Sequence, residues 1–182
     1  MKEIIVLMGG PGSGKGTVAE KICDYIKVNK IETGALFRSL PADSEISKII
    51  STGTLVPDTE LFKLIESKIY KTQDILLDGF PRTLPQAKWL IENYSDDFSI
   101  KIIYLDIPEE IMKQRIKNRL NNGSTRSDDN NDSVILKRLD NFQEITIPAI
   151  NWLHENEKIK FFYIDATPDK ENVIKQVYRI LN

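Results

Sequence analysis

Glycines, a lysine and a hydroxyl are concentrated in one short segment that follows an apolar run. The segment is Gly9-Gly10-Pro11-Gly12-Ser13-Gly14-Lys15-Gly16-Thr17, and the apolar run covers residues 4–8. Glycines allow the backbone to turn tightly enough for successive N–H groups to point at one anion. Lys15 adds a positive charge, and a helix starting there would add the positive end of its dipole. The segment therefore predicts a phosphate-binding loop rather than a turn that only joins a strand to a helix.

The residue after the lysine separates this loop from the commonest phosphate-binding loops. Their pattern has Ser or Thr directly after the lysine, whereas here Gly16 intervenes and Thr17 is the next hydroxyl. The loop therefore differs from that of the commonest ATPases and GTPases.

A carboxylate and an arginine follow a second apolar run, residues 75–77. They are Asp78 and Arg82. An Asp at the end of a buried strand is placed to hold Mg²⁺ or its waters, although Asp followed by Gly is also an ordinary strand-ending turn. Phosphoryl transfer requires fixed positive charges on the transferring group and the exclusion of water. Lys15, several arginines and a magnesium ion would meet that requirement.

Four apolar runs alternate with longer amphipathic stretches. They are residues 4–8, 75–77, 100–105 and 160–164. This alternation predicts an α/β fold, in which helices cover both faces of a parallel sheet and ligands bind at the carboxyl ends of the strands. Thr83 and Thr167, each close before a proline, are predicted helix caps, and Asp58 is a further candidate.

Two segments interrupt the alternation. Residues 31–60 contain short helical pieces punctuated by prolines and a glycine, and they indicate an inserted lobe. Residues 121–131 form a polar run between two helical patterns and have little capacity to bury apolar surface. We expect this run to form a surface loop, and its flanking arginines suggest closure over a charged ligand.

Composition excludes several classes of function. The chain has 182 residues, a formal charge of −2 and evenly mixed charges, so no basic face for nucleic acid is expected. Cys23 is the only cysteine, which rules out an internal disulfide and a cysteine-based zinc site. The N-terminal apolar run is too short for a signal peptide or a membrane span. We expect a cytoplasmic monomer with no membrane or nucleic-acid partner.

These residues resemble the adenylate kinases and, more broadly, the nucleoside monophosphate kinases. The resemblance covers almost the whole chain. It rests on the loop with its Gly16-Thr17 ending, Thr33-Gly34 with Arg38, residues 53–56, residues 76–87, and the arginines Arg115, Arg119, Arg126 and Arg138. It implies a P-loop three-layer αβα domain over residues 1–182 with a mostly parallel five-stranded sheet. It also implies a helical monophosphate-binding lobe at residues 31–60 and a short lid at residues 120–132.

The activity implied by the resemblance is reversible transfer of the γ-phosphoryl group of ATP to a nucleoside monophosphate, with Mg²⁺ on the triphosphate. The residues that would bind ATP are Gly12, Ser13, Gly14, Lys15, Gly16, Thr17 and Arg119. Those that would bind AMP are Thr33, Gly34, Arg38, Thr54, Leu55, Val56, Gly79, Arg82, Gln86, Arg126 and Arg138. The catalytic set would be Lys15, Arg82, Arg119, Arg126 and Arg138. Asp78 would orient magnesium through water, and Thr17 is a second candidate for contact with the metal.

AMP is the expected acceptor because Thr33 and Gln86 match the positions at which adenylate kinases read adenine. A glutamine amide can both donate to and accept from the edge of a base. The alternative for Gln86 is an ordinary solvated helix residue, and the alternative for the chain is a kinase of the UMP/CMP type.

Three departures from the family pattern bear on these expectations. Ala35 stands where an aspartate is usual, and Glu32 where a small hydroxyl residue is common. The distance from Arg126 to Arg138 is one residue longer than the family spacing. Because one residue turns a helix by about 100°, Arg138 reaches the site only if the loop at residues 128–132 absorbs the addition.

Two other classes of protein remain open. A P-loop hydrolase or GTPase would need a water-orienting Glu or Gln near Asp78, but Gly79 follows it. A nucleotide-binding protein with weak activity is compatible with Ala35 and the altered spacing.

Overall fold

The computed structural model describes residues 1–39, 41, 43–52, 56–121 and 132–182. The strands are β1 (Lys2–Gly9), β2 (Asn29–Glu32), β3 (Ile75–Asp78), β4 (Phe98–Asp106) and β5 (Lys160–Asp165). The helices are α1 (Lys15–Tyr25), α2 (Thr33–Arg38), α3 (Glu45–Ser51), α4 (Asp58–Glu66), α5 (Leu84–Tyr94), α6 (Glu109–Asn121), α7 (Asp132–Asn141), α8 (Ile147–His154) and α9 (Lys170–Leu181), and the π-helical turn η1 (Phe142–Thr146) joins α7 to α8.

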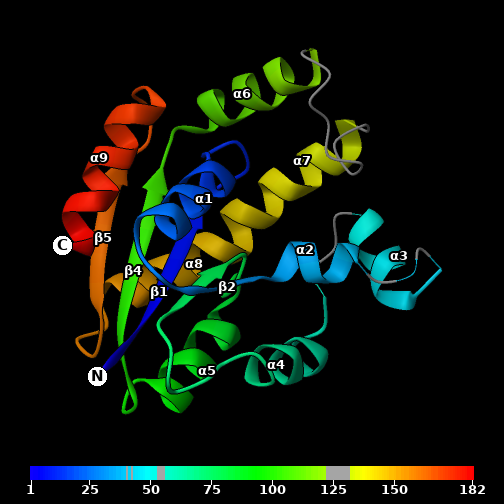
Figure 1. Cartoon of the computed structure of the whole chain (residues 1–182). Coiled ribbons are helices and arrows are strands. Elements are labelled where there is room, and N and C mark those ends of the chain that lie inside the picture. Colours follow the sequence, from blue (N-terminus) through cyan, green and yellow to red (C-terminus); the bar gives the residue numbers. More distant parts are fainter. Residues whose placement is uncertain (40, 42, 53–55, 122–131) are drawn as a thin grey trace.

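The five strands form one parallel sheet in the order β2-β3-β1-β4-β5 (Figure 1). The central strand β1 pairs with β3 on one side and β4 on the other, so that Val6 lies beside Leu77 and Ile102. These three side chains have no exposed surface. A parallel strand covered on both faces needs a nearly continuous apolar run, and residues 4–8 provide one.

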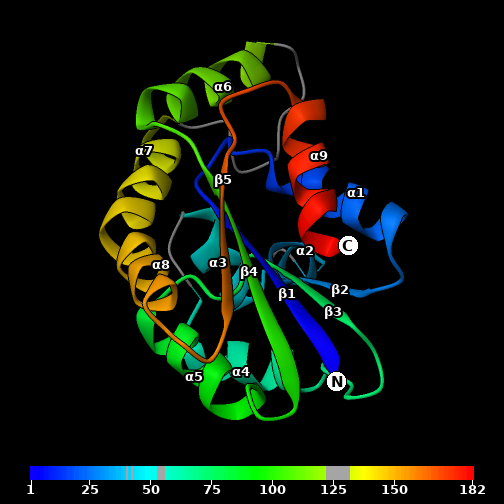
Figure 2. The ribbon, with the colours of Figure 1, turned by 90° about the vertical axis from the view of Figure 1, so that its left-hand side faces the viewer.

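Helices cover both faces of the sheet and make three layers. Figure 2 shows α1 and α9 on one side of the strands and α5, α7 and α8 on the other. The buried side chains Val173 and Val177 of α9 and Ala149 and Leu153 of α8 belong to the core. The predicted α/β fold is confirmed, and with it all four predicted strands.

The fifth strand, β2, was not indicated by an apolar run. It lies at the edge of the sheet, and Ile31 is its only buried residue. An edge strand is covered less than a central one, so it needs fewer apolar side chains. Residues 31 and 32 therefore lie in the sheet, and the segment between β2 and β3 starts at residue 33. Its helices α2 and α3 project away from the sheet (Figure 1).

The predicted helix caps have different outcomes. Thr83 caps α5, because its hydroxyl accepts a hydrogen bond from the backbone N–H of Gln86. The cap predicted at Thr167 is wrong: Asp169 caps α9 by accepting from the N–H of Asn172. A carboxylate two residues further along provides the acceptor for this helix start. Asp58 is the first residue of α4 rather than its cap.

The helices α7 and α8 form one continuous rod because η1 joins them without a break. Pro148, just after the π-helical turn, has no N–H to donate to the carbonyl of residue 144, and its ring would clash with that carbonyl in an α-helix. A wider turn, with hydrogen bonds across five residues, accommodates the proline without ending the helix.

Truncation of a buried side chain on the central strand tests how much the core of the sheet stabilises the fold. Ile5 has no exposed surface, whereas Leu136 on α7 is 53% exposed. We expect Ile5→Ala to lower the free energy of unfolding by about 2–5 kcal/mol, because the cavity adds to the lost burial. Leu136→Ala should change it by about 0.5 kcal/mol or less. Urea denaturation measures both, and similar losses for the two variants would contradict the assignment of the core.

Candidate active site

The glycine-rich segment forms a loop between the carboxyl end of β1 and the start of α1. Gly14, the residue before α1, has φ 89°, in the left-handed region that favours glycine. Such a residue turns the chain sharply into the helix, so the N–H groups at the start of α1 face the cavity above the sheet edge. The predicted loop therefore has the expected position between a strand and a helix.

Two side chains of this loop are arranged for an anion. Lys15 Nζ donates hydrogen bonds to the carbonyl oxygens of Gly9 and Gly10, which holds its charge over the loop. The Ser13 hydroxyl is buried and has no hydrogen-bond partner among the described residues. A buried hydroxyl without a partner is costly, and an oxygen of a bound phosphate would provide the missing acceptor.

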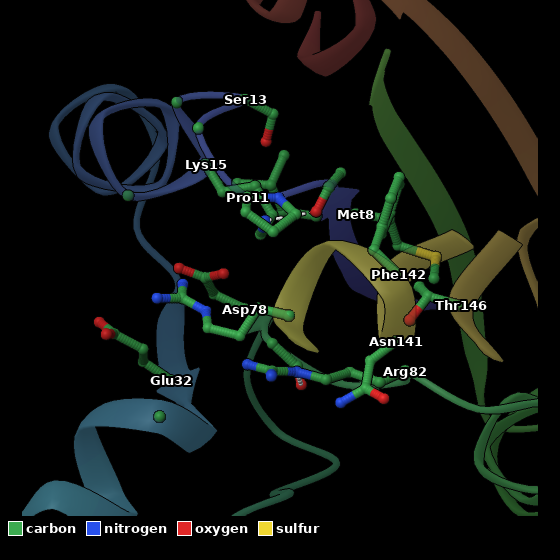
Figure 3. Close-up of a pocket in the computed structure, with 18 of the residues that line it drawn as sticks. Met8, Pro11, Ser13, Lys15, Glu32, Asp78, Arg82, Asn141, Phe142 and Thr146 are labelled. Carbon is green, nitrogen blue, oxygen red and sulfur yellow. Dashed lines mark hydrogen bonds between the residues drawn. The ribbon is translucent and has the colours of Figure 1, made fainter. Parts of the chain in front are cut away.

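The loop opens into a cavity at the carboxyl ends of the strands. Its lining residues include Gly12, Ser13, Gly14, Lys15, Gly16, Thr17, Glu32, Gly34, Asp78, Gly79, Arg82, Arg138, Asn141, Phe142 and Thr146. Figure 3 shows Ser13 and Lys15 on one side, Glu32 and Arg82 on the opposite side, and Phe142 and Thr146 on a third. The cavity thus joins β1, β2, β3 and η1, which are far apart in the sequence.

Two carboxylates end neighbouring strands at the cavity. Asp78 and Glu32 pair in register on β3 and β2, and Asp78 is buried. Lys30 Nζ lies 2.8 Å from Glu32 Oε2. Burial acts to lower the pKa of Lys30, but the hydrogen bond and charge of Glu32, together with the charge of Asp78, leave this pKa above its usual value. Lys30 therefore partly offsets the negative charge at this edge of the cavity.

Two arginines bring positive charge to the same cavity. Arg82 follows β3, and its Nε donates to the carbonyl of Gly79 at 2.9 Å. This bond curls the side chain back toward the cavity that it lines. Arg138, on the last turn of α7, also lines the cavity. The added residue before Arg138 thus does not keep it from the site, and the loop expected to absorb it falls almost wholly outside the described residues.

Three of the other predicted site residues are described but are not part of the cavity lining. Thr33, Val56 and Gln86 are buried and do not line it. Gln86 is only 1% exposed, so the alternative of a solvated helix residue is wrong. Arg38 and Arg119 belong to α2 and α6, but their side chains lie outside the described part of the chain, as do Thr54, Leu55 and Arg126 altogether.

The sequence did not indicate the wall formed by Asn141, Phe142 and Thr146. All three belong to η1 or precede it directly. In an α-helix, residues 142 and 146 would share a face, and the π-helical turn keeps both at the cavity while rotating α8 relative to α7. Pro148 is the only signal that could have suggested this turn.

The amino-acid sequence is similar to those of known proteins. The family model for adenylate kinase matches residues 7–158. The adenylate kinase of Bacteroides thetaiotaomicron is 34% identical over 185 residues, covering 95% of each chain. That of Flavobacterium psychrophilum is 33% identical over 188 residues, covering 98% of this chain and 97% of the relative. That of a Cyanothece strain is 29% identical over 189 residues, covering 98% and 94%.

The chain belongs to the adenylate kinase family. The predicted resemblance is thereby confirmed over nearly the whole length. The family match extends from β1 through α8 and includes the loop, Asp78, Arg82 and Arg138. No helix in the described ranges is both long and apolar enough to cross a membrane.

Two glycines of this adenylate kinase family member provide a matched test of local geometry. Gly14 and Gly79 have φ values of 89° and 86°. A Cβ on Gly79 would lie 2.7 Å from Thr33 Oγ1, whereas no described atom lies within 4 Å of one on Gly14. We expect Gly14→Ala to cost about 1–2 kcal/mol of stability from backbone strain alone. Gly79→Ala should cost about 2–4 kcal/mol, because it also displaces buried Thr33. Chemical denaturation measures this difference, and an equal or larger loss for Gly14→Ala would contradict it.

Proposed function

We propose that the protein catalyses reversible transfer of the γ-phosphoryl group of ATP to AMP, giving two molecules of ADP. The observation that supports this best is the single cavity in which Lys15 of the loop, Arg82 after β3 and Arg138 of α7 meet. Three fixed positive charges around one cavity suit a group that carries negative charge on several oxygens throughout its transfer. Membership of the adenylate kinase family supports the same reaction.

In this proposal the two substrates approach the cavity from different sides. Residues 12–17 and Arg119 hold ATP, with the N–H groups at the start of α1 directed at its phosphates. Arg38 and Arg82 hold the phosphate of AMP, and residues 33, 34, 54–56, 79 and 86 hold its remainder. Arg126 and Arg138 act on the transferring group.

The reaction needs no general base. An oxygen of the AMP phosphate is already ionised, and it forms a bond to the γ-phosphorus of ATP while the bond from that phosphorus to the bridging oxygen breaks. The β-phosphate leaves as part of ADP. Positioning and charge therefore account for the catalysis, and the contribution of Lys15 and the arginines is to hold the reacting oxygens in line.

The residues at the strand ends fit a magnesium ion that accompanies ATP. Asp78 and Thr17 both line the cavity, and their side chains carry the oxygen atoms that Mg²⁺ prefers as ligands. In the described part, no group of three or more His, Cys, Asp or Glu could hold a metal. This favours a magnesium ion that is held mainly by the phosphates of ATP and by water, with Asp78 acting on the ion through those water molecules. When bound, Mg²⁺ neutralises charge on the β- and γ-phosphates.

Two segments are proposed to exclude water. The inserted lobe, which starts at residue 33 after β2 and extends to about residue 60, would close over AMP, and the lid at residues 120–132 over ATP. Closure matters because the transferring group reacts readily with water, so an open site would hydrolyse ATP.

Formation of ADP from Mg-ATP tests the proposal when AMP, CMP, UMP and GMP are offered separately. We expect rapid turnover with AMP and much slower turnover with the others. Turnover with only CMP or UMP would overturn the choice of acceptor and favour a kinase of the UMP/CMP type. Hydrolysis without any acceptor would indicate a P-loop hydrolase. Binding of ATP without turnover would indicate a nucleotide-binding protein with weak activity.

A further inference from the structure

The side chain of Gln86 is held at both ends. Its Nε2 donates to Asp58 Oδ1 at 2.7 Å, and its Oε1 accepts from the backbone N–H of Arg82 at 2.7 Å. Gln86 is 1% exposed, so these bonds replace the contacts with water that its amide would otherwise make. One partner comes from α4 and the other from the segment before α5, so the amide links two elements.

These two partners fix which end of the amide is nitrogen. A backbone N–H can only donate and an ionised carboxylate can only accept. In the flipped orientation, Nε2 would face the N–H of Arg82, and Oε1 would face the Asp58 carboxylate. Both contacts would then be repulsive. A glutamine amide has two N–H groups and two acceptor positions, so one of each is left beyond these two bonds.

Asp58 is itself held in place by the packing of α4 on α5, which lie side by side in Figures 1 and 2. Phe62 is four residues after Asp58 and therefore lies on the same face of α4. The Phe62 ring stacks on Trp89 of α5, with centroids 4.5 Å apart and planes 6° from parallel. Both rings also make T-shaped contacts with Phe80. This contact positions the Asp58 carboxylate against Gln86.

We propose that Asp58 is a positioning residue that determines base specificity by fixing the amide of Gln86. The proposal rests on the proposed role of Gln86 in reading the base of AMP. Adenine offers an acceptor at N1 and a donor at its 6-amino group, whereas hypoxanthine offers a donor at N1 and an acceptor at its 6-oxo group. An amide of fixed orientation can complement one of these edges but not both.

Kinetics with AMP and inosine monophosphate test this, because the two acceptors differ only at that edge. The variants are Asp58→Ala, Asp58→Asn, Gln86→Ala and the Asp58→Ala/Gln86→Ala double variant. Glu60→Ala is the matched control, because Glu60 is also an acidic residue of the first turn of α4 but is exposed. The values of kcat and KM are measured for each acceptor at saturating Mg-ATP, and thermal melting confirms folding.

We expect Asp58→Ala to raise the KM for AMP about tenfold with kcat changed less than about twofold, since a hydrogen bond to a charged group is lost. The preference for AMP over inosine monophosphate should fall by about tenfold as well. Asp58→Asn retains an oxygen that accepts from Nε2 and should keep most of the preference. In the Gln86→Ala background, Asp58→Ala should add less than about a twofold change.

The possible failures are distinguishable. If Gln86→Ala leaves the AMP preference unchanged, Gln86 does not read the base, and both its role and that of Asp58 are overturned. If Gln86→Ala lowers the preference but Asp58→Ala does not, or if the two effects add independently, only the role of Asp58 is overturned. If Asp58→Ala does not fold, Asp58→Ser replaces it, because serine suits a helix start but is too short to retain the carboxylate contact.

Discussion

Replacement of Lys15 by methionine should reduce kcat by about 10²–10³-fold, the loss typical of removing one preorganised donor from a transition state. Methionine is similar in length to lysine but carries no charge. The substitution therefore retains most of the side-chain packing in the loop and removes the positive charge. Lys15 is held over the loop by the carbonyls of Gly9 and Gly10. Its charge is therefore in place before the substrate arrives, and little reorganisation is needed during the reaction.

The measurement is steady-state formation of ADP, together with calorimetric binding of ATP to separate catalysis from affinity. Lys21→Met is the control, because Lys21 is on the same helix but pairs with Asp24 at the surface. It should retain wild-type activity within about twofold. A loss of less than about threefold for Lys15→Met would contradict the assignment of the loop as the site of phosphate binding.

Arg82→Ala should have the second large effect, a fall of at least about 10²-fold in kcat/KM for AMP. The substitution removes the guanidinium but leaves the backbone N–H that donates to Gln86, so the orientation of that amide is preserved. Both kcat and KM should change, because the arginine is proposed to hold the acceptor phosphate before and during transfer.

Arg179→Ala is the control for a lost arginine. Arg179 lies exposed in the last turn of α9, a helix that contributes no residue to the cavity lining. Its removal should change kcat/KM by less than about twofold and the stability by about 0.5 kcal/mol or less. Equal effects of the two substitutions would contradict the proposed site.

The parts of the fold that were predictable from the sequence are those with local signals. Residues 4–8 of β1 are apolar without interruption because both faces of the strand are covered, and several glycines directly after a strand favour a tight turn. The edge strand β2 has one buried residue and therefore gave no comparable run. Thr167 was a reasonable cap by type, but Asp169 offers an acceptor two residues later, and a local pattern does not decide between neighbours.

The parts of the candidate site that were not predictable depend on distant contacts. Gln86 and Asp58 are 28 residues apart, and nothing in either segment indicates that they form a hydrogen bond. The cavity wall at Phe142 and Thr146 depends on the width of a helical turn, which a periodic pattern of apolar residues does not report. The role expected of Arg138 came from the resemblance alone, since a solvated helix arginine has the same local sequence.

The π-helical turn between α7 and α8 has a consequence for how such a site can change during evolution. The α7 half of the rod presents Arg138 to the cavity, whereas the α8 half presents Ala149 and Leu153 to the core. A wide turn holds one residue more than an α-helical turn, so its gain or loss rotates one half relative to the other. Mutation can therefore change the residues that face the substrates without repacking the core behind them.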